Sequence, residues 1–149
     1  MYCEKCDLSC ELDSRYSFGA DAPFKNFVEW YDWQFDKLRE EISANPEFCL
    51  TSAVELKHAS KDGKTQLVSA GRGVCTLSRE GLVYVGTEYG EEVRKEFPIS
   101  TIYRLLFGSG VDFELYVGKD IYFFVPDEKR SCVDWYIASI IFTDIYNKL

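Results

Sequence analysis

From residue 48 onward, apolar and polar residues alternate along the chain in a way that predicts a run of short β-strands. Between Val111 and Val117 every second residue is apolar, so one face of that strand is buried and the other meets water, as in an antiparallel sheet. Turn sequences such as Lys61-Asp62-Gly63-Lys64 and Gly108-Ser109-Gly110 separate the strands. Seven strands are expected, at residues 48–57, 66–77, 82–87, 92–98, 102–107, 111–117 and 121–125.

Two other segments carry a helical period. Residues 127–149 are expected to form a C-terminal helix, which begins after Asp127 or Ser131. Its apolar residues recur three and four apart and share one face: Trp135, Ala138, Ile141, Phe142, Ile145 and Leu149. A second helix starts at Phe27, with Asn26 and Glu29 as its N-terminal cap pair, and ends at Asn45-Pro46.

Taken together, these elements predict an α+β chain whose seven-stranded antiparallel barrel is capped by the C-terminal helix, as in a pleckstrin-homology-like fold. Gly71 and Gly73 interrupt the second strand and predict a bulge or a sharp bend there. The expected organisation is a Cys-bearing segment at residues 1–22, an amphipathic helix at residues 23–46 and the barrel with its closing helix at residues 47–149.

The net charge and the lengths of the apolar runs argue against some classes of function. The net charge of −8 argues against broad electrostatic attraction to nucleic acid or to an anionic membrane surface. No run of about 18 apolar residues occurs and the N-terminus does not resemble a signal peptide. The expected localisation is cytoplasmic, with peripheral membrane contact and the oligomeric state left open.

The cysteines give one candidate metal site. Cys3 and Cys6 have the spacing at which two thiolates can face one tetrahedral zinc ion, but a complete site needs four ligands. The pair is therefore interpreted as half of a zinc ribbon or as two reduced thiols. No cofactor is expected unless the rest of the ribbon is present. Cys49, Cys75 and Cys132 lie in strand and helix patterns, where small buried thiols are expected.

Basic residues gather around the first expected hairpin, where pleckstrin-homology domains can bind lipid phosphates. Glu55 and Asp62 interrupt the cluster, so solvated lysines on a hairpin tip are the alternative. His58 is the single histidine and is expected to be an exposed loop residue. The candidate anion patch consists of Lys57, Lys61, Lys64 and Arg72.

Surplus apolar surface on both helices predicts a docking face for a protein partner or a neighbouring domain. Trp30 and Trp33 lie beside the apolar stripe of the first helix, while Ile137 and Ile140 make the last helix apolar nearly all round. The alternative is that the two helices cover this surface themselves.

The order of motifs resembles the C-terminal region of bacterial 1-acylglycerol-3-phosphate acyltransferase-like proteins of the Firmicutes type. The resemblance rests on Cys3-x-x-Cys6, Trp30-Tyr31-Asp32-Trp33 and, in the β part, Gly71-Arg72-Gly73, Phe123-Phe124-Val125-Pro126 and Trp135-Tyr136-Ile137-Ala138. Those proteins carry a catalytic domain, which this chain lacks, before a zinc-ribbon-like segment.

The resemblance implies a non-catalytic accessory or regulatory module of phospholipid synthesis that mediates docking. An independent lipid- or peptide-binding module of the pleckstrin-homology or GRAM type is the alternative. A small thiol enzyme using Cys3 and Cys6 is a third class. No catalytic residue is assigned.

Overall fold

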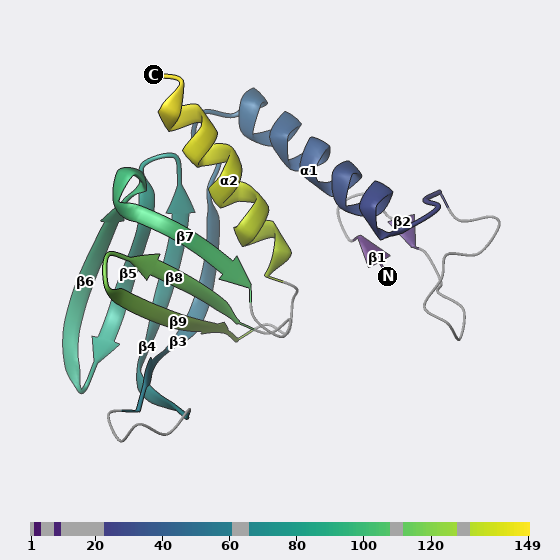
Figure 1. Cartoon of the computed structure of the whole chain (residues 1–149). Helices are drawn as coiled ribbons and strands as arrows, with labels where there is room; N and C mark the ends of the chain where they lie inside the picture. The colour runs from purple at the N-terminus through teal and green to yellow at the C-terminus, as the bar shows by residue number, and fades with distance from the viewer. Residues whose placement is uncertain (1, 4–7, 10–22, 61–65, 108–111, 128–131) are drawn as a thin grey trace. The chain divides into compact units, whose positions relative to one another are not determined.

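The chain forms a seven-stranded antiparallel sheet that curls into a half-barrel, with one helix before it and one after it (Figure 1). The computed structural model describes residues 2–3, 8–9, 23–60, 66–107, 112–127 and 132–149. By contacts the chain divides into two compact units, residues 1–40 and residues 41–149.

The first unit holds two short paired strands and most of the first helix. The strands are β1 (Tyr2–Cys3) and β2 (Leu8–Ser9), and the helix is α1 (Phe27–Ala44). The amide of Glu29 donates to Oδ1 of Asn26 at 2.9 Å, which confirms the expected cap. The helix ends directly before Asn45, also as expected. The predicted zinc half-ribbon is not tested, because Cys6 lies outside the described residues.

The second unit contains the sheet and the closing helix. The sheet strands are β3 (Leu50–Ala59), β4 (Leu67–Ser78), β5 (Gly81–Glu88), β6 (Glu91–Pro98), β7 (Ile102–Phe107), β8 (Phe113–Val117) and β9 (Asp120–Pro126). A single 3-10 turn, η1 (Ile99–Thr101), leads into β7, and α2 (Val133–Asn147) follows β9. All seven expected strands are present, displaced by three residues or fewer at their ends.

The spatial order of the strands is β6-β5-β4-β3-β9-β8-β7, with every neighbouring pair antiparallel. The first four strands form one meander and the last three another, and β3 joins the two by pairing with β9. Figure 1 shows β7, β8 and β9 lying across the other strands, with α2 beside β7. This order and the closing helix give the expected pleckstrin-homology-like fold.

Glycines allow β4 and β5 to approach closely where the sheet bends. A Cβ on Gly71 would lie 1.9 Å from the carbonyl oxygen of Thr87, and a Cβ on Gly73 would lie 2.3 Å from that of Val85. The pairing of β3 with β4 also shifts register between Leu56 and Lys57. The prediction of a bulge or bend at these glycines is confirmed.

The helix α2 supplies much of the core. Trp135 stacks on Phe113 with ring centroids 4.6 Å apart, and Phe142 is fully buried. The expected apolar face is therefore correct through Phe142, whereas Leu149 at its far end is exposed. The helix starts after Cys132, one residue beyond the later of the two expected caps, and Cys132 makes no side-chain cap bond.

Burial separates the three central cysteines. Cys75 and Cys132 are buried, and burial raises the pKa of the Cys132 thiol to about 11. Cys49 is exposed, so the expectation of a buried thiol is wrong there.

The C-terminal turn of α1 is held by the β4–β5 turn. The guanidinium of Arg79 donates a hydrogen bond to the carbonyl of Ile42, which would otherwise be one of the unpaired carbonyls at the end of the helix. The last turn of α1 contains no basic residue of its own. Arg79 thus supplies a C-terminal cap from a distant part of the sequence.

Candidate functional site

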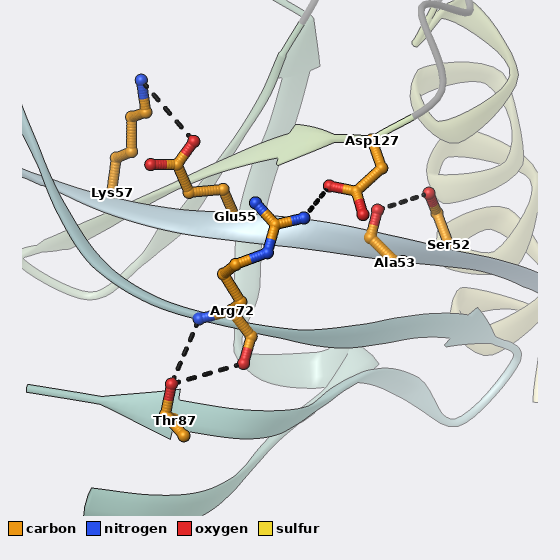
Figure 2. Close-up of polar contacts among 7 residues, drawn as sticks. All are labelled: Ser52, Ala53, Glu55, Lys57, Arg72, Thr87 and Asp127. Atoms are coloured by element: carbon orange, nitrogen blue, oxygen red, sulfur yellow. Dashed lines mark hydrogen bonds and ion pairs between the residues drawn. The ribbon is translucent and has the colours of Figure 1, made fainter. Parts of the chain in front are cut away.

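The described members of the expected anion patch, Lys57 and Arg72, each form an ion pair with a carboxylate (Figure 2). Nζ of Lys57 lies 3.9 Å from a carboxylate oxygen of Glu55. Arg72 forms an ion pair with Asp127, and its backbone is tied to Thr87. Lys61 and Lys64 lie outside the described residues. Lys57 and Arg72 therefore do not converge as a pair of donors for one phosphate.

His58 is not the exposed loop residue expected from the sequence. Its Nε2 lies 2.9 Å from Oε2 of Glu88, and Nζ of Lys95 lies 3.1 Å from Oε1 of the same carboxylate. The imidazole stacks on the ring of Tyr89 and meets the ring of Tyr122 edge-on. We call His58, Glu88 and Lys95 the Glu88 clamp. It joins β3, β5 and β6.

Electrostatics favour the ionised form of the carboxylate in this clamp. Partial burial by itself would raise the pKa of Glu88, but the hydrogen bonds from His58 and Lys95, together with their charges, outweigh it and lower the pKa below the ordinary value. Both carboxylate oxygens already have a partner, because Nε2 of His58 lies at Oε2 and Nζ of Lys95 lies at Oε1. The clamp therefore serves the structure by fastening the β5–β6 hairpin to the rest of the sheet.

The expected partner face is divided by the structure. In the first unit, Trp30 and Trp33 are partly exposed, and Trp33 packs against Phe24 with ring centroids 5.4 Å apart. On α2, Ile137 is fully buried and is not available to a partner, whereas Ile140 is partly exposed. Ile140 is thus the one residue of the α2 pair that stays at the surface.

Strand β7 is one edge of the sheet, a feature that the sequence did not reveal. It pairs with β8 on one side, and the strand order places no described strand on its other side. An edge strand presents unpaired backbone N–H and C=O groups along its open side. The exposed side chains on β7 include Tyr103 at 77% and Phe107 at 41% exposure.

Helix α2 runs beside this edge and offers an apolar wall. The ring of Tyr136 meets the ring of Phe107 edge-on at 5.4 Å between centroids. Ile140 lies one helical turn beyond Tyr136, and Val133 lies one turn before it, so the three residues share a face. All three are partly exposed. We call β7 together with this helical face the β7 edge site.

The opposite edge of the sheet, β6, has a different surface. Its exposed residues are mostly charged: Glu91, Glu92, Arg94 and Glu96. Nε of Arg94 lies 2.7 Å from a carboxylate oxygen of Glu96. Charged side chains along an edge strand disfavour the addition of another strand. One edge of the sheet is therefore lined mostly by charged side chains, whereas the exposed side chains of the other are Tyr103, Phe107 and a single charged residue, Arg104.

Comparisons with known proteins do not identify a family. No family model matches the chain, and no curated protein matches it. Among solved structures, it is similar to the C-terminal MyTH4-FERM domain of human myosin 7b, a structure determined in complex with the harmonin-a PDZ3 domain. That similarity has a TM-score of 0.39 at 11% sequence identity and covers 74% of this chain and 20% of the myosin chain. This chain therefore spans about a fifth of that protein.

A membrane-crossing helix is not found in the described part of the chain, because neither helix is both long and apolar enough.

Proposed function

We propose that the chain is a non-catalytic docking module that accepts an extended segment of a partner protein on the β7 edge site. The observation that carries the proposal is the contrast between the charged β6 edge and the aromatic β7 edge, which has a partly exposed helical wall beside it. An extended peptide can add to such an edge as a further strand, and its main chain then pairs with the open backbone groups.

The helical wall supplies what main-chain pairing lacks. Backbone hydrogen bonds alone do not distinguish one peptide from another, whereas pockets for alternate side chains do. Phe107 and Tyr136 form an aromatic corner, and Ile140 extends it by one helical turn. A large apolar side chain of the incoming segment would bury its surface there, which contributes about 1.5–3 kcal/mol when burial is complete.

The resemblance to acyltransferase C-terminal regions is compatible with this role and suggests that the module works beside an acyltransferase. In such a setting the docked segment would belong to the enzyme or to a protein that regulates it. Binding of lipid phosphates is less well supported, because the described cations Lys57 and Arg72 both carry carboxylate partners. Purified chain supplied with an acyl thioester and lysophosphatidate should show no acyl transfer.

Selection of displayed random eight-residue peptides on the purified chain, followed by NMR mapping of each selected peptide, tests the proposal. Amide shifts should concentrate in β7 and α2. The substitutions Phe107→Asp and Ile140→Lys should each weaken binding about tenfold or more, because each places a charge in the apolar wall.

Val74→Asp is the matched control. Val74 is 43% exposed, close to the value for Phe107, but it lies on β4 in the middle of the sheet. This variant should bind as the wild type does. The proposal fails if no peptide is selected, if the shifts map to β6 or to the outer face of the sheet, or if Val74→Asp weakens binding as much as Phe107→Asp.

A further inference from the structure

The β7 edge site also contains a charge that has no described carboxylate partner. Five cations other than histidine lie on the described sheet strands, and four of them, Lys57, Arg72, Arg94 and Lys95, form ion pairs. The fifth is Arg104 on β7, which is exposed and has no ion pair among the described residues. Its guanidinium lies over the ring of Tyr103, 5.3 Å from the centroid.

The nearest acidic side chain on the adjoining strand has a different partner. Arg104 is opposite Tyr116 on β8, and Glu114 is two residues away on that same strand. The hydroxyl of Tyr116 donates to Oε2 of Glu114 at 2.7 Å. This hydrogen bond and the carboxylate charge raise the pKa of Tyr116. Glu114 is thus bound by the phenol, and Arg104 keeps its guanidinium donors for another acceptor.

The geometry of β7 determines where Arg104 lies relative to Phe107, which forms the aromatic corner with Tyr136. Leu105 is buried, so its neighbour Arg104 faces the outer side of the sheet, and Phe107 faces the same side as Leu105. The pairing with β8 is regular from Arg104 to Phe107. These two residues are therefore three positions apart, about 10 Å along the strand, on opposite faces.

We infer that the partner segment bound at the β7 edge site is an acidic and aromatic peptide. It carries a carboxylate side chain opposite Arg104 and a large apolar side chain, three residues away along the same strand, against Phe107 and Tyr136. A spacing of two would put both side chains on one face and allow only one of the contacts. This inference rests on the proposed function and adds the chemical class of the partner.

Defined synthetic peptides test the inference on the full chain. Each would be an eight-residue peptide of threonine and valine with one phenylalanine. A glutamate would stand three residues before the phenylalanine, three residues after it or two residues before it, and glutamine would replace glutamate in the uncharged references. The two three-residue spacings cover both directions in which a strand can add to an edge.

One of the three-residue glutamate peptides should bind about three- to fivefold more tightly than its glutamine reference, the scale of a solvent-exposed ion pair. The gain should shrink as salt is raised, and it should vanish in Arg104→Gln. Arg94→Gln is the control, because Arg94 is an exposed arginine on the opposite edge; it should leave the gain unchanged.

The outcomes separate the two proposals. If the glutamine peptides perturb the amides of β7 but glutamate brings no gain, or if the gain survives in Arg104→Gln, the inference about acidic peptides is wrong while docking at β7 stands. Equal gains at spacings of two and three would likewise overturn it. If no peptide perturbs β7, both proposals fail.

Discussion

The two edge strands of the sheet, β6 and β7, both expose unpaired backbone groups, but they differ in the side chains that surround these groups. Among the described strands, each pairs with a single neighbour and so carries a row of backbone groups that could accept another strand. On β6, charged side chains line the surface and Arg94 pairs with Glu96. On β7, Tyr103 and Phe107 are exposed and a helix lies alongside.

The difference shows that only one of the two edges, β6, is lined by charges that disfavour pairing with another strand. The β6 edge is also fastened from inside by the Glu88 clamp, which binds the β5–β6 hairpin to β3. A protein that needed only to avoid aggregation would have reason to charge both edges. The exposed surface of β7, by contrast, is aromatic apart from Arg104. Four experiments on stability and association test how far the two edges differ.

The largest effect is expected from the packing of α2 on the β7–β8 hairpin. Trp135→Ala removes the ring that stacks on Phe113 of β8 and should lower the free energy of unfolding by about 3–5 kcal/mol. Urea denaturation measures the loss. Tyr146→Ala, at an exposed position on the same helix, should change stability far less. Equal effects of the two substitutions would mean that α2 does not anchor this side of the barrel through Trp135.

The second largest effect is expected from loss of the Glu88 clamp, which holds the β5–β6 hairpin to β3. Glu88→Gln replaces a carboxylate that His58 and Lys95 contact and should cost about 1.5–3 kcal/mol near pH 6, the usual range for a hydrogen bond to a charged group. Glu92→Gln, at an exposed glutamate on β6, should cost almost nothing.

The pH dependence of this loss follows from the lowered pKa of Glu88. Because the folded pKa lies below the ordinary value near 4.5, the stabilisation is complete above that value and is lost as the pH falls through the lower folded pKa. The difference in unfolding free energy between wild type and Glu88→Gln should therefore disappear in strong acid. A difference that persisted or grew there would show that the carboxylate charge is not what stabilises the clamp.

A third experiment removes the charge from the guarded edge. Replacing Glu92, Arg94 and Glu96 together by threonine should make β6 able to pair with a second copy. The expected gain is about 1 kcal/mol in association, roughly a fivefold lower dimer dissociation constant. Light scattering over a concentration series measures it. Glu80→Thr makes the same change in net charge away from the edge and should not promote association.

The smallest effect compares single arginines on the two edges. Arg94→Gln and Arg104→Gln should each change the free energy of unfolding by about 0.5 kcal/mol or less, because both side chains are exposed to solvent. Thermal or urea unfolding checks this. A large loss in Arg104→Gln would mean that the guanidinium supports the fold instead of waiting for a partner.

The sequence predicted the fold well because its signals are local. Strand alternation and turn residues depend on neighbours a few positions apart, and so does the cap formed by Asn26 and Glu29. The sequence left the start of α2 open between two caps, Asp127 and Ser131, and the helix begins close to the later one, after Cys132, which makes no side-chain cap bond.

The candidate site was predicted only in part because its properties depend on pairing order. Ile140 could be recognised as surplus apolar surface, but its neighbour Ile137 turned out to be buried. Nothing in the sequence near β7 marks it as an edge, since that status arises from the order of all seven strands. The Glu88 clamp was missed for the same reason: His58 and Glu88 are thirty residues apart in the sequence.

The contact between Arg79 and Ile42 has a consequence for the order of events during synthesis. The two residues are 37 positions apart, and the carbonyl group that accepts the bond emerges first. Until the β4–β5 turn has been made and has folded, the last turn of α1 can end only against water. The helix is therefore able to start early from its own N-terminal cap, but its Ile42 carbonyl gains the Arg79 partner only after the β4–β5 turn has folded.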